Sequence, residues 1–170
     1  EMSVRVKASV INVWSVSNSR GFVRTGDYFD KQVASDDLTN YKIVGPDCFA
    51  YNPSRLNVGS IALNSTSESG AVSPMYVVFR VLKDLVTPQY LFELLKSSKM
   101  NDQFIRVAQG GVRAQVRYKD LAQLQIPLPP LEVQNEIVAE IEGYQKVING
   151  ARAVLDHYRP SIPIHTDWPM

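Results

Sequence analysis

The chain has 170 residues, of which 45% are hydrophobic and 21% are charged. That size suits one domain with a substantial core plus an appendage, and it argues against two full domains. The single cysteine, Cys48, excludes an internal disulfide, and the chain has neither a secretory signal nor an apolar run of membrane-spanning length. We therefore expect a cytoplasmic protein that does not associate with a membrane.

The small net charge of +1 hides an uneven distribution along the chain. Residues 1–126 carry 15 Lys and Arg against 11 Asp and Glu, which gives +4. Residues 127–170 carry 3 against 6, which gives −3. A mildly basic body joined to an acidic segment is typical of a nucleic-acid-facing part and a protein-facing part, although many inert domains differ by as much.

The first half of the chain has the short apolar runs and turn residues of a sheet. Gly45-Pro46-Asp47 is a turn signature, and the longest wholly apolar run, Met75 to Phe79, suits a buried strand. We expect strands within residues 4–16, 42–44, 48–51, 60–63 and 76–81, loops at 15–26, 52–59 and 64–70, and a short helical turn at 36–41.

The pattern changes to helical spacing at Thr87-Pro88, where Thr87 is suited to cap a helix that begins at Pro88. A second helix is expected over 100–108, stopping at Gly110-Gly111 and burying Phe104, Ile105 and Ala108. A turn at 119–121 and a last strand at 123–128 complete the body. This order of elements predicts an α+β fold with a mixed or antiparallel sheet.

The last third of the chain predicts one long helix of about 28 residues, or about 40 Å. Pro129-Pro130 can begin a helix, Glu132 suits the positive end of its dipole, and Pro160 stops it. Its apolar residues recur at steps of four and three, the heptad spacing of a coiled coil. They are Ile137, Ile141, Tyr144, Ile148, Ala151, Leu155 and Tyr158.

An apolar stripe of this kind needs another surface to cover it. No second stretch of the chain has a matching heptad run, so we expect the partner helix to lie outside these 170 residues. The alternative is a helix packed on its own domain, which is the usual origin of an apolar helix face. The regularity of the heptads and the proline stops favour the coiled coil.

Four stretches of the chain resemble, in the same order, the specificity subunits of type I restriction-modification systems. They are YNPSRLNVGSI at 51–61, VSPMYVVF at 72–79, GGVR at 110–113 and IPLPPLEVQ at 126–134, the last running into the long helix. The resemblance implies that residues 1–128 are a target recognition domain that reads one half of a split double-stranded DNA sequence. It further implies a spacer and docking helix at 129–160, with residues 161–170 leading towards a next domain.

The resemblance also implies which chemistry lies elsewhere. In that family the specificity subunit is not an enzyme and binds no cofactor, and S-adenosylmethionine belongs to the adenine-specific methyltransferase subunits that dock on the helix. The restriction subunit would join indirectly. A second recognition domain would come from the same longer chain or from a second copy, and the sequence leaves both open.

Reading base edges requires Arg, Lys, Asn or Gln on loops that enter a groove, and holding phosphates requires Arg, Lys and backbone N–H groups. Glycine would let the backbone approach a phosphate. Three loops supply the candidates: Arg20 and Arg24; Asn52, Arg55 and Asn57; and Gly110, Gly111, Arg113, Arg117 and Lys119. For each arginine a solvated surface position or a salt bridge at the edge of the core is an equally good interpretation.

Enzymatic interpretations have little support in the residues. Asn52-Pro53-Ser54-Arg55 lacks the second proline and the aromatic residue of an amino-methyltransferase motif, and no Gly-x-Gly nucleotide loop occurs. His157, His165 and Cys48 have no metal-ligand or nucleophile spacing. Two other hypotheses stay open: a coiled-coil protein-interaction scaffold that binds no DNA, and the specificity end of a fused methyltransferase.

Overall fold

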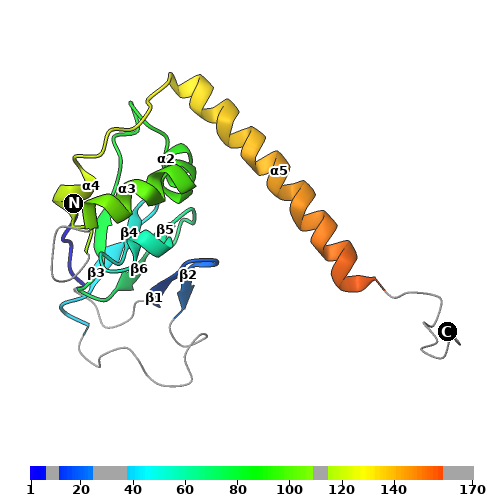
Figure 1. Ribbon diagram of the computed structural model, residues 1–170. Coiled ribbons are helices and arrows are strands. Elements are labelled where there is room, and N and C mark those ends of the chain that lie inside the picture. The colour runs from blue at the N-terminus through cyan, green and yellow to red at the C-terminus, as the bar shows by residue number, and fades with distance from the viewer. Residues whose placement is uncertain (7–11, 25–37, 109–114, 159–170) are drawn as a thin grey trace, which may run out of the picture.

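The computed structural model describes residues 1–6, 12–24, 38–108 and 115–158. They form a body of two small sheets and short helices, from which one long helix projects (Figure 1). This is the predicted α+β architecture. In chain order, the elements are β1 (Asn12–Ser17), β2 (Gly21–Arg24), β3 (Lys42–Val44), β4 (Phe49–Tyr51), η1 (Leu56–Val58), β5 (Ile61–Leu63), β6 (Gly70–Val72), β7 (Val77–Phe79), α2 (Pro88–Lys96), α3 (Ser98–Ala108), α4 (Tyr118–Leu121) and α5 (Leu131–His157).

The strands form one mixed and one antiparallel sheet. The mixed sheet has the order β2-β1-β6-β3, in which β1 and β6 run parallel and the other neighbours antiparallel. The antiparallel sheet has the order β5-β4-β7, with Phe49 opposite both Leu63 and Phe79. Both sheets are short, so the helices supply much of the cover for the core.

The main core lies between the antiparallel sheet and helices α2 and α3. The rings of Phe49 and Phe79 stack at 4.8 Å between centroids, and an edge of Tyr51 meets Phe79 at 6.2 Å. Leu91 and Phe104 are among the buried side chains that the helices add to this cluster. Aromatic pairs of this kind stabilise a core beyond the area that they bury.

Residues 15–24 form a hairpin, so the predicted loop over 15–26 is wrong in its described part. Strands β1 and β2 pair antiparallel around a turn at 18–20, and Gly21 adopts φ +67°, which suits a tight reversal. The rings of Trp14 and Phe22 meet at 5.1 Å. The strand was hidden because polar Ser and Asn residues flank the alternating positions Trp14 and Val16.

Two further loops contain more structure than predicted. The loop at 52–59 includes the helical turn η1, which forms because Leu56 is fully buried. Gly70 begins β6 instead of ending a surface turn, and an added Cβ there would collide with the Trp14 ring. The absence of a side chain therefore lets the strand lie against the indole.

The edges of the sheet region also depart from prediction. Only single bridges form at Met2 and Arg5, and Val4 is exposed, so the described residues before Asn12 form no regular strand. Leu38 to Tyr41 form a turn closed by the Tyr41 N–H and the Leu38 carbonyl at 2.9 Å, not a helical turn. Met75 is 60% exposed and lies outside β7.

Helices α2 and α3 are confirmed, with one error in their packing. Thr87 caps α2, its hydroxyl accepting a hydrogen bond from the Tyr90 N–H at 3.3 Å, and Pro88 is the first helical residue. Helix α3 begins at Ser98 and buries Met100, Phe104 and Ala108. Ile105 is 37% exposed because it follows Phe104 by about 100° around the helix and turns away from the core.

The predicted last strand over 123–128 is wrong. Residues 123–130 are irregular, and the prolines at 127, 129 and 130 have no N–H to offer to a sheet. Leu124 and Ile126 still pack on the main core, which explains why the segment has the apolar content of a strand. The predicted turn at 119–121 is part of the one-turn helix α4.

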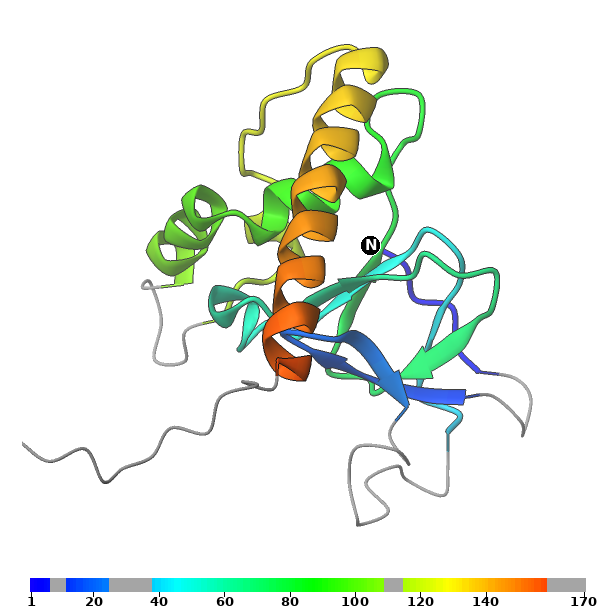
Figure 2. The same ribbon diagram turned by 90° about the vertical axis from the view of Figure 1, so that its right-hand side faces the viewer.

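Helix α5 spans Leu131–His157 after Pro130, within the predicted 129–160. It starts beside α2 and moves away from the body along its length (Figure 1), and the side view places it across one face (Figure 2). Tyr158 follows the helix, and the residues from 159 onwards lie outside the described part, as does the predicted tail at 161–170. No described helix is both long enough and apolar enough to cross a membrane.

Gln134 fixes the first turn of α5 to the body. Its side chain is fully buried, and its Oε1 accepts a hydrogen bond from the Thr87 N–H at 2.9 Å. Its Nε2 donates to the Leu85 carbonyl at 3.0 Å and to the Pro129 carbonyl at 2.8 Å. A buried amide is tolerated here because its oxygen and both of its N–H donors are satisfied.

Candidate functional site

The loop at 52–59 is rigidly built around Arg55. The Arg55 carbonyl accepts hydrogen bonds from the N–H groups of Val58 at 3.2 Å and Ser60 at 3.1 Å, while its side chain is exposed. Asn52 uses its side-chain Oδ1 to accept the Ser54 N–H at 3.0 Å. Arg55 is therefore presented to solvent from a fixed backbone, and Asn52 also has a structural role in shaping the loop.

A second segment lies directly beside this loop. The Val116 N–H donates to the Pro53 carbonyl at 2.9 Å, and Gln115 Nε2 donates to Ser54 Oγ at 3.0 Å. Arg117 follows at the start of α4, where its backbone N–H donates to Asp120 Oδ2 at 3.0 Å. The side chains of Arg117 and Lys119 are both exposed, as base or phosphate contacts would require.

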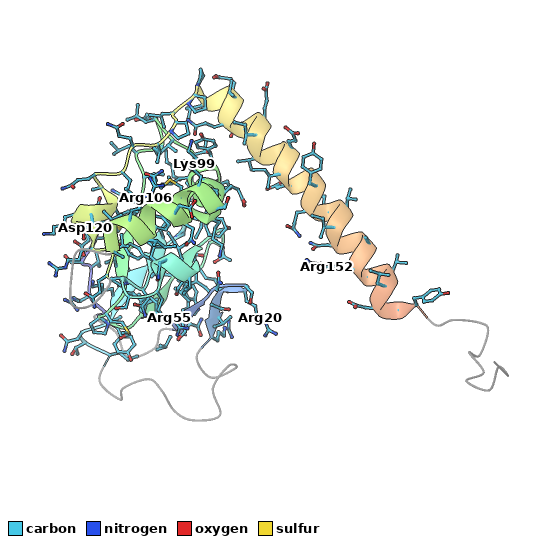
Figure 3. All side chains as sticks on the ribbon, viewed as in Figure 1. Arg20, Arg55, Lys99, Arg106, Asp120 and Arg152 are labelled. Carbon is cyan, nitrogen blue, oxygen red and sulfur yellow. The ribbon has the colours of Figure 1, made fainter. Side chains whose placement is uncertain are left out.

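The β1–β2 hairpin approaches the same loop from the other side. An open depression of about 560 Å³ lies between them, lined by Arg55, Val58 and Ser60 and by the hairpin residues Ser15 to Ser19 and Val23. Figure 3 shows Arg20 and Arg55 at the same end of the body. We call the hairpin turn at 18–20, the loop at 52–59 and the segment at 115–119 together the loop rim.

The structure thus brings most of the described candidates together. Arg20, Asn52, Arg55, Asn57, Arg117 and Lys119 all lie on the loop rim. Arg24, at the end of β2, lies outside this rim but lines a further open depression together with Arg20 and Glu68. Its guanidinium is 4.0 Å from the Glu68 carboxylate; both side chains are well exposed, so this ion pair contributes little. Gly110, Gly111 and Arg113 lie outside the described residues.

Sequence reasoning missed three basic residues of the helices. Lys99 and Arg106 are exposed on one face of α3, where they line an open depression of about 520 Å³ together with Asp102 and Leu124 (Figure 3). Their spacing of seven residues on an amphipathic helix was a usable signal. Lys96, at the end of α2, reaches the loop rim through contacts 37 and 78 residues away in sequence, which no local pattern reveals.

No catalytic group is apparent at the loop rim. Among the described residues, no three His, Cys, Asp or Glu side chains gather as a metal site would require. The nearby Tyr51 is fully buried, and burial raises the pKa of its hydroxyl. Exposed cations and amides on shaped loops are suited to binding a polyanion, not to acid–base chemistry.

The apolar stripe of α5 is exposed along its whole length. Its members Ile137, Ile141, Tyr144, Ile148, Ala151, Leu155 and Tyr158 are all solvent-accessible, with Leu155 72% exposed. The body-facing residues Gln134 and Val138 lie about a quarter of a turn from the centre of the stripe. The described part of the body therefore leaves the stripe uncovered, and the external partner helix stays a prediction.

Comparison with known proteins identifies the kind of domain to which this arrangement corresponds. A family model described as the type I restriction modification DNA specificity domain matches residues 48–153, more than half of the chain. The chain belongs to this family. The matched region of this specificity domain begins at Cys48, just before β4, and includes most of α5.

Individual relatives agree with the family match. The chain is 25% identical over 142 residues to the type I restriction enzyme MjaX specificity subunit of Methanocaldococcus jannaschii, covering 82% of this chain and 33% of that protein. It superposes on the HsdS subunit from Thermoanaerobacter tengcongensis with a TM-score of 0.58 and 26% identity, over 66% of this chain and 29% of that one. A chain from a structure of type I R-M complex assembly and conformational transition gives the same TM-score and identity and is covered to 30%.

The chain therefore spans 33% or less of the length of these relatives. The prediction of a specificity domain, made from four short stretches, is confirmed. None of the matches favours a scaffold that binds no DNA or a fused methyltransferase.

Proposed function

We propose that this specificity domain reads one half of a bipartite double-stranded DNA sequence and delivers it to separate methyltransferase subunits. The observation that carries the proposal is the division of the molecule into two surfaces. Shaped loops with exposed Arg55 and Arg117 form one surface, and the uncovered apolar stripe of α5 forms the other. A DNA-reading domain that acts only within an assembly needs both a surface for DNA and a surface for its protein partners.

At the loop rim, we assign the sequence-specific contacts to Arg20, Arg55, Asn57, Arg117 and Lys119. Gly110, Gly111 and Arg113 stay candidates from the sequence alone, because they lie outside the described residues. Arginine can donate two parallel hydrogen bonds to the O6 and N7 atoms of guanine, and lysine can neutralise a phosphate. Asn52 contributes by holding the loop in shape, because its side-chain oxygen is engaged by Ser54. Arg24 lies outside the loop rim, and Glu68 at 4.0 Å competes with a phosphate for its guanidinium, so we rank it below the rim residues.

At α5, the proposed partners are proteins. The apolar stripe would pack against a second spacer helix, supplied by the same longer chain or by a second copy, and the same helix would dock the methyltransferase subunits. S-adenosylmethionine and the adenine-methylating chemistry belong to those subunits, and the restriction subunit joins through them. This chain itself would hold no cofactor, perform no catalysis and act in the cytoplasm.

Methylation mapping tests the proposal. The full reading frame is expressed with its modification subunit in a methylation-free host, and the modified adenines are located by sequencing. Exchanging residues 1–128 for those of another specificity domain should change one half of the split motif and leave the other half intact. An unchanged motif would move recognition elsewhere and favour the scaffold hypothesis.

A second experiment, on substituted variants, tests the residues assigned to DNA contacts. Replacing Arg55, Arg113 and Arg117 together by Ala should abolish specific DNA binding by the assembled complex at moderate salt. Arg152→Ala serves as the matched control, because Arg152 is exposed on α5 away from the loop rim (Figure 3). Undiminished binding by the triple variant would show that the site assignment is wrong even if the domain swap succeeds.

A further inference from the structure

Lys96 joins two loops that sequence places far apart. It is the last residue of α2, and its Nζ donates to the Asn18 carbonyl at 2.7 Å, to Asn18 Oδ1 at 3.1 Å and to the Gly59 carbonyl at 3.1 Å. An ammonium group has three N–H donors, so three acceptors satisfy it fully. The side chain is therefore committed to these contacts and is not left to bind a phosphate.

Each contacted loop carries a proposed DNA contact. Asn18 begins the hairpin turn that ends at Arg20, and Gly59 closes the helical turn that begins after Arg55. The depression of about 560 Å³ lies between these two loops. The spacing of Arg20 and Arg55 hence depends on how the hairpin turn is held against the loop at 52–59.

Gly59 makes the close approach possible. It adopts φ +81°, which side chains rarely tolerate, and an added Cβ would collide with Asn18 Oδ1 and lie 3.2 Å from Asn18 Cγ. The Asn18 side chain thus occupies the space that a residue at position 59 would otherwise fill. Lys96 Nζ then donates hydrogen bonds to the carbonyl groups of both Asn18 and Gly59.

The environment of Lys96 differs from that of an ordinary surface lysine. The residue is half-buried, and this burial lowers the pKa of its ammonium group, while Glu93 on the same helix acts in the opposite direction. Removing a charge from water is unfavourable unless hydrogen bonds replace the lost water contacts. Those bonds are directional, so they fix the positions of both carbonyl groups as well as binding them.

We propose that Lys96, Asn18 and Gly59 form a clip that sets the spacing of the two DNA-reading loops, with Lys96 as a positioning residue for sequence discrimination. The inference rests on the proposed function. Base reading demands that contacting side chains be held to within about 0.5 Å, so loss of the clip should relax discrimination before it prevents binding. Lys96 itself touches no DNA in this proposal.

The test uses the full reading frame assembled with its modification subunit. Lys96→Met keeps the length of the side chain and removes its donors, Lys96→Arg restores donors, and Lys146→Met is the control at an exposed lysine on α5, outside the loop rim and the apolar stripe. The readouts are the ratio of methylation at the target site to that at single-mismatch sites, the salt slope of DNA binding, and the unfolding temperature. A domain swap of residues 1–128 is run in parallel.

The expected result is a fall of about tenfold or more in the discrimination ratio for Lys96→Met, the size of one mismatch penalty. Lys96→Arg should recover part of the ratio, Lys146→Met should retain it, and all variants should still assemble. Asn18→Ala, which removes one of the three acceptors, should give a smaller fall and keeps the test available if Lys96→Met folds poorly.

Three outcomes would overturn the proposal. An unchanged ratio with a lowered unfolding temperature would make the clip merely structural. An equal loss of methylation at the target site and at the mismatch sites, with the salt slope of DNA binding reduced by about one, would make Lys96 a phosphate contact. An unchanged ratio and stability would make the contact irrelevant. A domain swap that fails to change the motif overturns the proposed function instead, which separates the two failures.

Discussion

At the scale of single residues, Gln134 shows how a polar side chain can determine the placement of a whole element. It satisfies the Thr87 N–H and the Leu85 and Pro129 carbonyls from a fully buried position. Groups left without a partner in such a place lose their hydrogen bonds and cannot regain them from water. Removing the Gln134 side chain should therefore cost more folding free energy than the net value of its hydrogen bonds, because its buried partners are left unsatisfied.

Gln134→Leu should destabilise the folded chain by about 2–4 kcal/mol, because it leaves a buried N–H and buried carbonyl groups unsatisfied. Equilibrium unfolding in urea measures the change. Gln145→Leu is the matched control on the same helix, since Gln145 is exposed and its Nε2 donates to Asn149 Oδ1 one turn further along α5. Equal effects of the two substitutions would contradict the anchoring role.

At the scale of elements, the contact between α2 and α5 includes two like charges. The pKa of Glu93 is raised, chiefly by burial, and Glu142 on α5 raises it further while Lys96 opposes both. A carboxyl whose pKa is raised by folding stabilises the fold fully only below its ordinary pKa. That stabilisation is lost as the pH rises through the raised value.

Glu93→Gln should therefore raise the unfolding temperature at pH 7.5, by about 1–2 °C after allowance for solvent screening of a half-exposed group. The gain should vanish near about pH 3.5, where the carboxyl is protonated in both states. Thermal unfolding followed by circular dichroism gives the comparison. Glu136→Gln, on the opposite face of α5 from Val138, should show no such gain.

The apolar stripe of α5 supports a prediction about assembly. Ile141→Asp with Ile148→Asp should abolish association with the partner helix, because two charges would be buried at the centre of a coiled-coil contact. Light scattering and co-purification with the modification subunit measure assembly. Near-ultraviolet circular dichroism should stay unchanged, since neither side chain packs in the core of the body.

Lys146→Asp is the control for added negative charge, because position 146 lies about half a turn from the stripe. It should leave assembly intact. If the double variant assembled as well as the unaltered chain, the stripe would not be the contact surface.

The sequence could predict those elements whose signals are local. Thr87-Pro88 marks the start of α2 by capping chemistry alone, and the heptads of α5 need only a spacing rule. The β1–β2 hairpin was missed because its polar residues resemble a loop until β6 is placed beside it. The proline-rich segment after Gln123 was misassigned because apolar content without N–H donors imitates a strand.

The same division applies to the site. The three loops could be recognised from their basic and glycine residues, but their joining into one rim depends on contacts such as Val116 to Pro53 and Lys96 to Asn18. These contacts connect residues far apart in sequence. The partly structural role of Asn52 and the pairing of Arg24 with Glu68 are likewise set by the tertiary fold.

At the scale of the whole molecule, the modest charge of the body predicts weak DNA binding by the isolated chain. Affinity should fall with salt, with a slope of about −0.9 for each phosphate neutralised. Arg55→Ala or Arg117→Ala should each reduce the magnitude of that slope by about 0.9 if the side chain holds a phosphate. If the side chain reads a base instead, the slope should stay unchanged and the preference at one base position of the target should be relaxed. Fluorescence anisotropy across a salt series measures both.

Tight and sequence-specific binding by the isolated chain at physiological salt would contradict this prediction. It would show that the chain acts without an assembly. Arg152→Ala should leave the slope unchanged, because its position on α5 is remote from the loop rim.

The anchoring of α5 at one end gives the helix the properties of a lever arm. Only its first turns touch the body, while the rest extends away for most of about 40 Å. A rotation of about 5° at the root would displace the far end by about 3.5 Å, close to the rise of one base-pair step along a DNA strand. In a two-domain assembly, the register between the two half-sites would then be decided at Gln134, a residue far from either half-site.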